Sequence, residues 1–222
     1  MKKTIFLIAA FVFAAVIAHA QTEKGSQTLG ASLGFSYNKN SGFNFNPYDN
    51  SSSSADSKST NFTIGPSYSY FIADKLDLGA TVFYNTSTSD YTPAPNNLSR
   101  LSANSFGGMA FLRKYFLHDG KIGVRTGPYI GYDRSRNTLI YSANIIGANQ
   151  NNETDNYRVG GRLDLVYFPS KRFGFSATLA SLDYVHYKTD AGVQGHASGN
   201  TADLNLINNN LQLSVFYAFG SK

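Results

Sequence analysis

The pair His196 and Ser198 is the strongest candidate for catalytic chemistry in this sequence. A histidine can take the proton of a serine hydroxyl so that the serine attacks an ester, provided that an acidic side chain orients the imidazole. Asp190 and Asp203 are nearby acids, but neither stands beside the pair. The pair falls in a glycine-rich stretch typical of a solvated loop, and so short a motif is weak evidence. We therefore expect a solvent-exposed histidine.

Metal and cofactor sites have weaker candidates still. The chain contains no cysteine, which removes thiolate ligands and disulfides. Asp183 and His186 are three residues apart on an expected strand, so their side chains point to opposite faces. The Asn- and Asp-rich stretches lack the ordered spacing of a calcium-binding loop. We predict no catalytic, cofactor-binding or metal-binding residue, and no enzyme activity.

These residues stand among runs in which apolar and small polar residues alternate, the pattern of a β-strand with one apolar face. The run at 101–116 contains a Gly-Gly pair, and the orientation of its two faces stays open. Polar stretches expected to be long loops lie at 38–59, 86–99, 144–156 and 189–205. We predict eight strands, at 29–37, 61–71, 76–84, 101–116, 122–132, 157–167, 173–188 (with a change of parity near Ser181) and 211–219.

Three tight turns follow an aromatic pair, at Tyr70-Phe71, Tyr115-Phe116 and Tyr167-Phe168. The pairs recur about every 45–50 residues and each turn joins two alternating runs, which predicts a repeated β-hairpin. Aromatic residues beside every short turn indicate that the turns lie at one level. We expect these residues to form a girdle at a membrane–water interface.

Short turns alternate with long polar connections, and the number of strands is even, as in barrels that cross a bacterial outer membrane. A sheet in lipid must close on itself, because unpaired backbone groups are costly there. The expected fold is all-β: an eight-stranded antiparallel up-and-down transmembrane β-barrel. Its short turns would be periplasmic, its long loops extracellular and both termini periplasmic.

In such a barrel the apolar parity faces lipid and the small polar parity faces the lumen. Ionisable residues on the second parity would then be enclosed, chiefly Arg125, Arg162 and Asp164, joined by Arg158 and Asp77. Enclosed charges are costly unless they are paired and hydrogen-bonded. Eight strands leave an interior just wide enough for side chains to fill. We therefore predict an ion network that plugs the lumen.

The first 20 residues are typical of a secretory signal peptide, with Lys2 and Lys3, an apolar stretch and an Ala-His-Ala site that ends at Ala20. Cleavage there leaves a single domain, 21–222. The formal charge of +5 becomes +3 without the two lysines, and the remaining basic residues are scattered. This pattern excludes a nucleic-acid-binding surface.

The signal peptide, the eight-run layout, the Tyr-Phe turns and the closing run at 211–219 resemble small outer-membrane β-barrel proteins of Gram-negative bacteria. These are the OmpA/OmpX-like group, with an outer membrane protein beta-barrel domain. The resemblance covers nearly all of the chain after residue 20. It implies a bacterial outer-membrane location, contact with lipid and lipopolysaccharide, and a monomer. It also implies insertion by machinery that reads an aromatic residue of the last strand, for which Phe219 is the nearest match.

The expected function is structural or surface-interacting: envelope integrity, adhesion or recognition through polar extracellular loops. The glycine-rich lumen parity also fits a small pore or a ligand-holding barrel. Outer-membrane lipid A deacylases resemble this chain in having a His-x-Ser pair on an eight-stranded barrel, so a lipid A-modifying hydrolase is another alternative. The last alternative is a soluble lipocalin-like barrel, which would have the apolar parity inside.

Overall fold

The computed structural model describes residues 22–46, 51–92, 98–141, 150–190, 195–206 and 212–220. The signal peptide predicted at 1–20 lies outside these residues. Within them, no helix is long and apolar enough to cross a membrane. The strands are β1 (Gln27–Asn46), β2 (Ser51–Ala73), β3 (Leu76–Thr92), β4 (Leu98–His118), β5 (Ile122–Tyr141), β6 (Gln150–Tyr167), β7 (Phe173–Asp190), β8 (His196–Leu206) and β9 (Gln212–Phe219).

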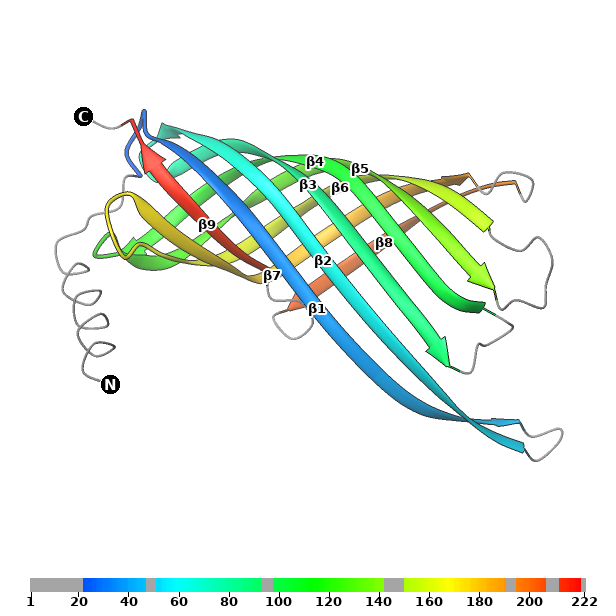
Figure 1. The fold of residues 1–222 in the computed structure, drawn as a ribbon. Helices are drawn as coiled ribbons and strands as arrows, with labels where there is room; N and C mark the ends of the chain where they lie inside the picture. The colour runs from blue at the N-terminus through cyan, green and yellow to red at the C-terminus, as the bar shows by residue number, and fades with distance from the viewer. Residues whose placement is uncertain are drawn as a thin grey trace, which may run out of the picture.

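The strands form one antiparallel sheet that closes into a barrel (Figure 1). Each strand from β1 to β7 pairs with the next, and β9 pairs with both β7 and β1. β8 and β9 lie one after the other along β7, so the nine segments make a ring of eight strands. The predicted eight-stranded up-and-down barrel is confirmed. Along the described part of β1, pairing with β9 extends from Gln27 to Gly34, and pairing with β2 continues to Asn46.

The strands are longer than the alternating runs of the sequence. Much of each polar stretch predicted as a loop is strand: β1 and β2 cover most of 38–59, and β8 covers most of 189–205. This prediction was wrong because these segments are rich in serine, threonine and asparagine on both faces. Hydrophobic alternation is a signal only where one face meets an apolar medium. In Figure 1 the β1–β2 hairpin extends furthest from the rest of the barrel.

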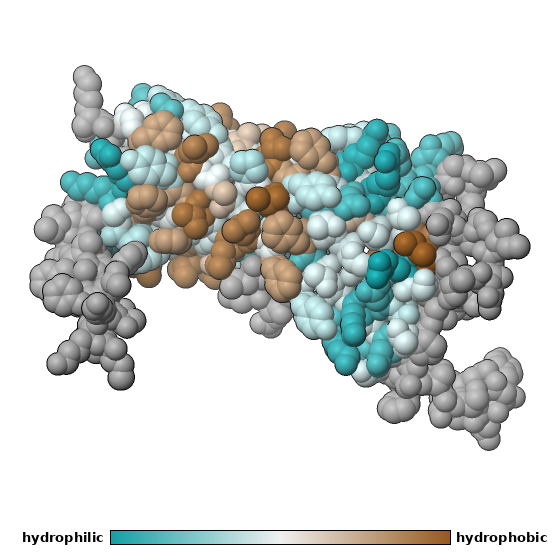
Figure 2. All heavy atoms as spheres, viewed as in Figure 1, coloured by the Kyte–Doolittle hydropathy of each residue, from teal (hydrophilic) through white to brown (hydrophobic). Residues whose placement is uncertain are grey.

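The outer surface carries an apolar band, as predicted for a face in contact with lipid (Figure 2). On β6 it extends from Tyr157 through Val159 and Leu165 to Tyr167, each between 39% and 48% exposed. Ten residues of a tilted strand rise by roughly 25 Å, which is the height of the apolar band of an outer-membrane barrel. Beyond the band the surface becomes hydrophilic, as the teal atoms at one end of Figure 2 show.

Exposed aromatic residues border the band at both ends. We call the end of the barrel that carries the three short turns the turn end. Its exposed aromatic residues are Tyr70, Phe116, Tyr167, Phe173 and, on β9, the partly exposed Tyr217. Toward the opposite end, here the hairpin end, they are Phe35, Phe62, Tyr84, Phe106, Tyr132 and Tyr157. This is the double girdle of transmembrane barrels.

Only one residue of each Tyr-Phe pair joins the girdle. Phe71, Tyr115 and Phe168 are at most 1% exposed and turn into the barrel. The reason is the period of two, since adjacent residues on a strand face opposite sides. The expectation that both aromatics of each pair form the girdle was therefore wrong for half of them.

The inward aromatics build an apolar cluster at the turn end of the lumen. Its members are Phe71, Tyr115, Val166, Phe168 and Phe216. The rings of Phe71 and Tyr115 lie 5.4 Å apart, and Phe168 meets Phe216 edge-on at 5.3 Å. The segment before β1 adds a cover, because Gly25 N–H donates to the Phe71 carbonyl at 2.9 Å.

Two ambiguities of the sequence are resolved by the pairing. In β4 the outward residues include Phe106 and Phe116, and Phe111 and Tyr115 face inward. In β7, Thr178 pairs with Asp164 and Ala180 with Leu163, so Leu179 is an extra residue in a bulge. The bulge reverses the parity of β7, as the slip near Ser181 indicated. It also lies where β7 exchanges β9 for β8 as its neighbour.

Candidate functional site in the barrel lumen

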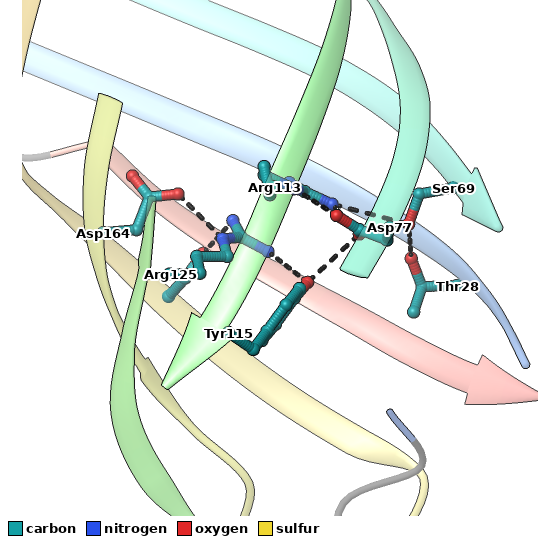
Figure 3. Close-up of polar contacts among 8 residues, drawn as sticks. Thr28, Ser69, Asp77, Arg113, Tyr115, Arg125 and Asp164 are labelled. Atoms are coloured by element: carbon teal, nitrogen blue, oxygen red, sulfur yellow. Dashed lines mark hydrogen bonds and ion pairs between the residues drawn. The ribbon is translucent and has the colours of Figure 1, made fainter. Parts of the chain in front are cut away.

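One buried carboxylate organises the polar side chains inside the barrel. Asp77 on β3 is fully buried and accepts hydrogen bonds from both neighbouring strands (Figure 3). Ser69 Oγ and Tyr115 Oη donate to Asp77 Oδ2 at 2.7 and 3.2 Å. Arg113 donates from Nε to Oδ1 at 3.0 Å and from Nη2 to Oδ2. Two parallel bonds of this kind fix the guanidinium as well as neutralise it.

Tyr115 joins Asp77 to a second ion pair. Its hydroxyl accepts from Arg125 Nη1 at 3.2 Å. Arg125 Nε donates to Asp164 Oδ2 at 2.8 Å, and Arg125 Nη2 donates to Ser176 Oγ at 2.8 Å. The side chains of Arg125 and Asp164 are only 6% and 5% exposed. Thr178 Oγ1 satisfies the other Asp164 oxygen at 2.9 Å. A pair so well bonded offsets much of its desolvation cost.

These contacts cross the barrel from wall to wall. On β1, Thr28 Oγ1 meets Ser69 Oγ at 2.6 Å, and on β7 Ser176 and Thr178 complete the other side. The chain of bonds therefore touches every strand from β1 to β7. Figure 3 shows the labelled side chains converging on the barrel interior. We call the five central residues the lumen network: Asp77, Arg113, Tyr115, Arg125 and Asp164.

The structure brings together three of the five charges that the sequence placed in the lumen, namely Asp77, Arg125 and Asp164. Arg113 and Tyr115 were missed, because the parity of the fourth run stayed open. Their signal in the sequence is the inward series Phe111, Arg113, Tyr115 on the strand beside Asp77. Cation–π contact supports the series, since the Arg113 guanidinium carbon lies 3.8 Å from the centre of the Phe111 ring.

Nearer the hairpin end, Arg158 and Asp133 form a separate pair. Arg158 Nε donates to Asp133 Oδ1 at 2.6 Å, and Asn156 Nδ2 donates to Oδ2 at 2.9 Å. Asp133 is 1% exposed as a residue, whereas the Arg158 side chain keeps 35% exposure. Asp133 was not among the predicted lumen charges, although it lies on the same parity as Arg125.

Arg162 differs from the other lumen arginines. Its guanidinium carbon lies 5.4 Å from the centre of the Tyr129 ring. Its Nε is buried and has no hydrogen-bond partner. Both oxygens of Asp164 are already engaged by Arg125 and Thr178. Within the described residues, no carboxylate forms an ion pair with Arg162.

Two cavities adjoin these side chains on the hairpin side of the lumen network. One, of about 250 Å³, is lined by Arg113, Arg125, Arg158 and Arg162, together with Asp164 and Asp183. The other, of about 340 Å³, is lined by Arg158 and Arg162 and by polar residues including Asn61, Ser181 and Asn205. The two arginines are common to both.

His196 and Ser198 lie at the start of β8, on the hydrophilic hairpin end, and not in a loop. The His196 side chain is 81% exposed, and its Nδ1 lies 3.6 Å from Asp190 Oδ1. Between these two described residues there is no hydrogen bond from the Ser198 hydroxyl to the imidazole. An exposed pair of this kind lacks the serine–histidine contact that nucleophilic catalysis requires.

Asp183 and His186 point to opposite sides of β7. Asp183 lines a lumen cavity and accepts from Ser181 Oγ at 2.8 Å. His186 lies outside, 6.3 Å from Tyr157 between ring centres, and its Nδ1 is 2.9 Å from Asn200 Oδ1. In the part of the chain that the structure describes, no three His, Asp or Glu side chains gather closely enough to hold a metal ion.

Solved structures with a similar fold are outer-membrane β-barrels. OprG from Pseudomonas aeruginosa is 12% identical, with 92% of this chain and 99% of that one aligned at a TM-score of 0.47. The N-terminal β-barrel domain of Pseudomonas aeruginosa OprF is 16% identical over 88% and 98%, at 0.38. Neisserial surface protein A is 12% identical over 89% and 98%, at 0.36. No protein-family model and no curated protein sequence matches the chain.

The geometry of the chain itself defines its class. A closed ring of eight antiparallel strands has an apolar outer band, two aromatic borders and charged residues inside. This is the architecture of a small outer-membrane β-barrel, OmpA-like and porin-like in its general form. The lipocalin-like alternative required the apolar parity inside, and the structure places that parity outside.

Proposed function

We propose that this chain is a non-conducting outer-membrane barrel with a structural or surface-interaction role. The observation that carries the proposal is the lumen network, which links β3 to β6 across the interior and reaches β1, β2 and β7 through hydrogen-bonded serine and threonine side chains. On its turn side, the apolar cluster around Phe71, Phe168 and Phe216 adds a layer of buried rings. Water and ions would have to displace both layers to pass.

In this proposal the signal peptide at 1–20 directs export and is removed. The turn end and both termini of the chain face the periplasm, and the hairpin end extends outside the cell. The barrel inserts as a monomer among lipid and lipopolysaccharide, through machinery that reads the last strand at Phe219. Phe219 is partly exposed and its ring stacks 6.4 Å from that of Tyr217.

The hairpin end supplies the surface for interaction. Many of its outward side chains are polar or charged, and ion pairs such as Arg136–Glu153 and Arg100–Asp90 link neighbouring strands. The strands continue beyond the apolar band at this end, where many surface atoms are hydrophilic (Figure 2). A soluble or host-surface partner could meet it without touching lipid. This role needs no enzymatic step.

Conductance in planar lipid bilayers tests the proposal. The purified, refolded protein is expected to insert without stable conductance steps, because the lumen network and apolar cluster stay in place. A porin reconstituted in the same way shows that channels would be detected, and the heat-dependent shift in gel mobility shows that the sample is folded. Reproducible unitary conductance from the folded wild-type chain would refute a closed lumen and favour the small-pore alternative.

A further inference from the structure

Among the described arginines that line the lumen, one has no carboxylate partner. Three arginines have a carboxylate partner, in the pairs Arg113–Asp77, Arg125–Asp164 and Arg158–Asp133. Arg162 has none among the described residues, and its Nε is buried without an acceptor. A buried donor without a partner is unfavourable, and for a charged group the cost is larger. A hydrogen-bond acceptor bound beside Arg162 would therefore lower this cost.

The space beside Arg162 has the properties of a small ligand site. The cavity of about 340 Å³ is lined by Arg162 and Arg158. It lies within the range of volumes seen for small-molecule pockets. Arg158 donates its Nε–H to Asp133, and no hydrogen bond within the described residues engages the Nη donors of this partly exposed guanidinium.

A second unsatisfied group belongs to a residue that lines the same cavity. Asn61 on β2 lines it, and the buried Asn61 Oδ1 has no hydrogen-bond partner. An amide turned by half a rotation would present Nδ2–H donors to the same space. Two of the three buried side-chain atoms without a partner in the described structure, Asn61 Oδ1 and Arg162 Nε, thus belong to residues that share one cavity.

The lining also shows which sign of ligand fits. Among the described acidic residues that line these two cavities, Asp183 is the one without an arginine partner. Asp183 lines the other cavity, and Ser181 and Asn205 donate to its Oδ2 at 2.8 and 3.5 Å. Its carboxylate is held by these neutral groups and does not neutralise Arg162. The cavity of about 340 Å³, whose described lining contains Arg158 and Arg162 and no acidic residue, is therefore cationic.

We propose that Arg162 and Arg158 form a binding site for a small anion that carries a carboxylate or phosphate group. The oxygens of the anion would accept from the Nη atoms of Arg162 and Arg158. A turn of the Arg162 side chain would also bring its enclosed Nε to the anion, and the turned amide of Asn61 would complete the site. Arginine suits this task because its planar set of donors matches both groups. The site lies on the hairpin side of the lumen network, so it does not require a conducting pore.

The proposal is tested by NMR on ¹⁵N-labelled protein in zwitterionic micelles, with inorganic phosphate and acetate as separate probes. The Nε–Hε signal of Arg162 is identified by its absence from Arg162→Gln. Each probe is expected to shift this signal saturably, and sodium chloride at equal ionic strength is not. In Arg162→Gln, half-saturation of the shift of the Arg158 Nε–Hε signal is expected to need a probe concentration about tenfold higher than in wild type, or more.

Two further variants sharpen the result. Asp183→Asn removes a nearby negative charge and is expected to tighten anion binding, whereas Arg136→Gln changes an exposed arginine outside the lumen and is expected to leave it unchanged. Without anion, Arg162→Gln is expected to unfold at the same or a higher urea concentration than wild type, because it removes an unpaired charge. A folding defect would instead mark Arg162 as structural and overturn the proposal.

A last arm separates the sources of the anionic group. Nanodiscs of zwitterionic lipid are compared with nanodiscs that also contain phosphatidylglycerol. A shift of the Arg162 signal with free phosphate or acetate assigns a soluble anion, and a shift with phosphatidylglycerol alone assigns a lipid headgroup. Absence of a saturable shift in every arm, or the same shift with chloride, would refute the site. None of these outcomes depends on whether the barrel conducts.

Discussion

At the scale of single residues, the barrel interior depends on a few carboxylates that each serve several donors. Asp77 accepts from Ser69, Arg113 and Tyr115, so it neutralises a cation and also fixes the tyrosine that reaches Arg125. Loss of one such acceptor leaves several buried donors without a partner. The penalty should therefore exceed that of an exposed ion pair.

Asp77→Asn tests this hierarchy. The substitution keeps the shape of the side chain and removes its charge, which leaves Arg113 unpaired. We expect the free energy of unfolding to fall by about 3 kcal/mol, as for buried pairs that lose one partner. Urea unfolding in lipid vesicles measures the change. The matched control Asp90→Asn breaks the exposed pair with Arg100 and should cost less than about 1 kcal/mol.

Asp155 lies on the hydrophilic hairpin end, beyond Tyr157 and the apolar band, and its contribution to the stability of the fold depends on pH. Hydrogen bonds from Arg134 at 2.8 and 3.1 Å, and then one from Tyr132, lower the pKa of Asp155 below its ordinary value of 3.8. A carboxyl with a lowered pKa stabilises the fold above its ordinary value, and this contribution is lost as the pH falls through the folded value.

We therefore expect Asp155→Asn to be less stable than wild type near neutral pH and to match it in strong acid. Unfolding of the two proteins, measured by tyrosine fluorescence across the acid range, checks this convergence. A difference that stays constant below the ordinary pKa would show that the ion pair with Arg134 does not contribute through its charge.

At the scale of the strands, close approach of the β4 backbone at the Gly127-Pro128 step of β5 affects the packing. Gly127 on β5 faces the lumen, and a Cβ atom built on it would overlap the carbonyl oxygen of Leu112 on β4. Pairing of β4 with β5 is interrupted at this point without a change of register. The β5–β6 pairing continues through it, with Pro128 opposite Gly161. Gly127 therefore allows the neighbouring strand to approach.

Gly127→Ala is expected to destabilise the barrel by roughly 1–3 kcal/mol, the usual cost of overpacking. Gly161→Ala is the matched control, because a Cβ there would have 4.0 Å to its nearest neighbour, the Gly127 carbonyl oxygen. Urea midpoints of the two variants should differ clearly, with Gly161→Ala close to wild type. Equal midpoints would mean that the strands can separate at the Gly-Pro step at no cost.

At the scale of the whole molecule, alternation alone predicts the part of the barrel that lies in lipid. The apolar parity at Leu29, Leu33 and Phe35 faces outward as expected, because only there does one strand face meet an apolar medium. The parts of the strands beyond the apolar band have no alternation of apolar and polar residues, so they were predicted as loops. The lumen charges followed from parity, but their partners depend on register and bulges, which set Arg113 beside Asp77 and leave Arg162 without a carboxylate.

The central claim is that the apolar parity contacts lipid and the polar parity lines an enclosed lumen. The chain has no cysteine, so single cysteines can carry a nitroxide label without background. Outward positions are Leu78 and Ile130, and lumen positions are Thr81 and Ser105. Electron paramagnetic resonance in lipid vesicles measures how often each nitroxide collides with oxygen, which is concentrated in lipid, and with a water-soluble nickel chelate. We predict high oxygen and low nickel accessibility at Leu78 and Ile130, and low oxygen accessibility at Thr81 and Ser105. High nickel accessibility at Leu78 and Ile130 would contradict the account.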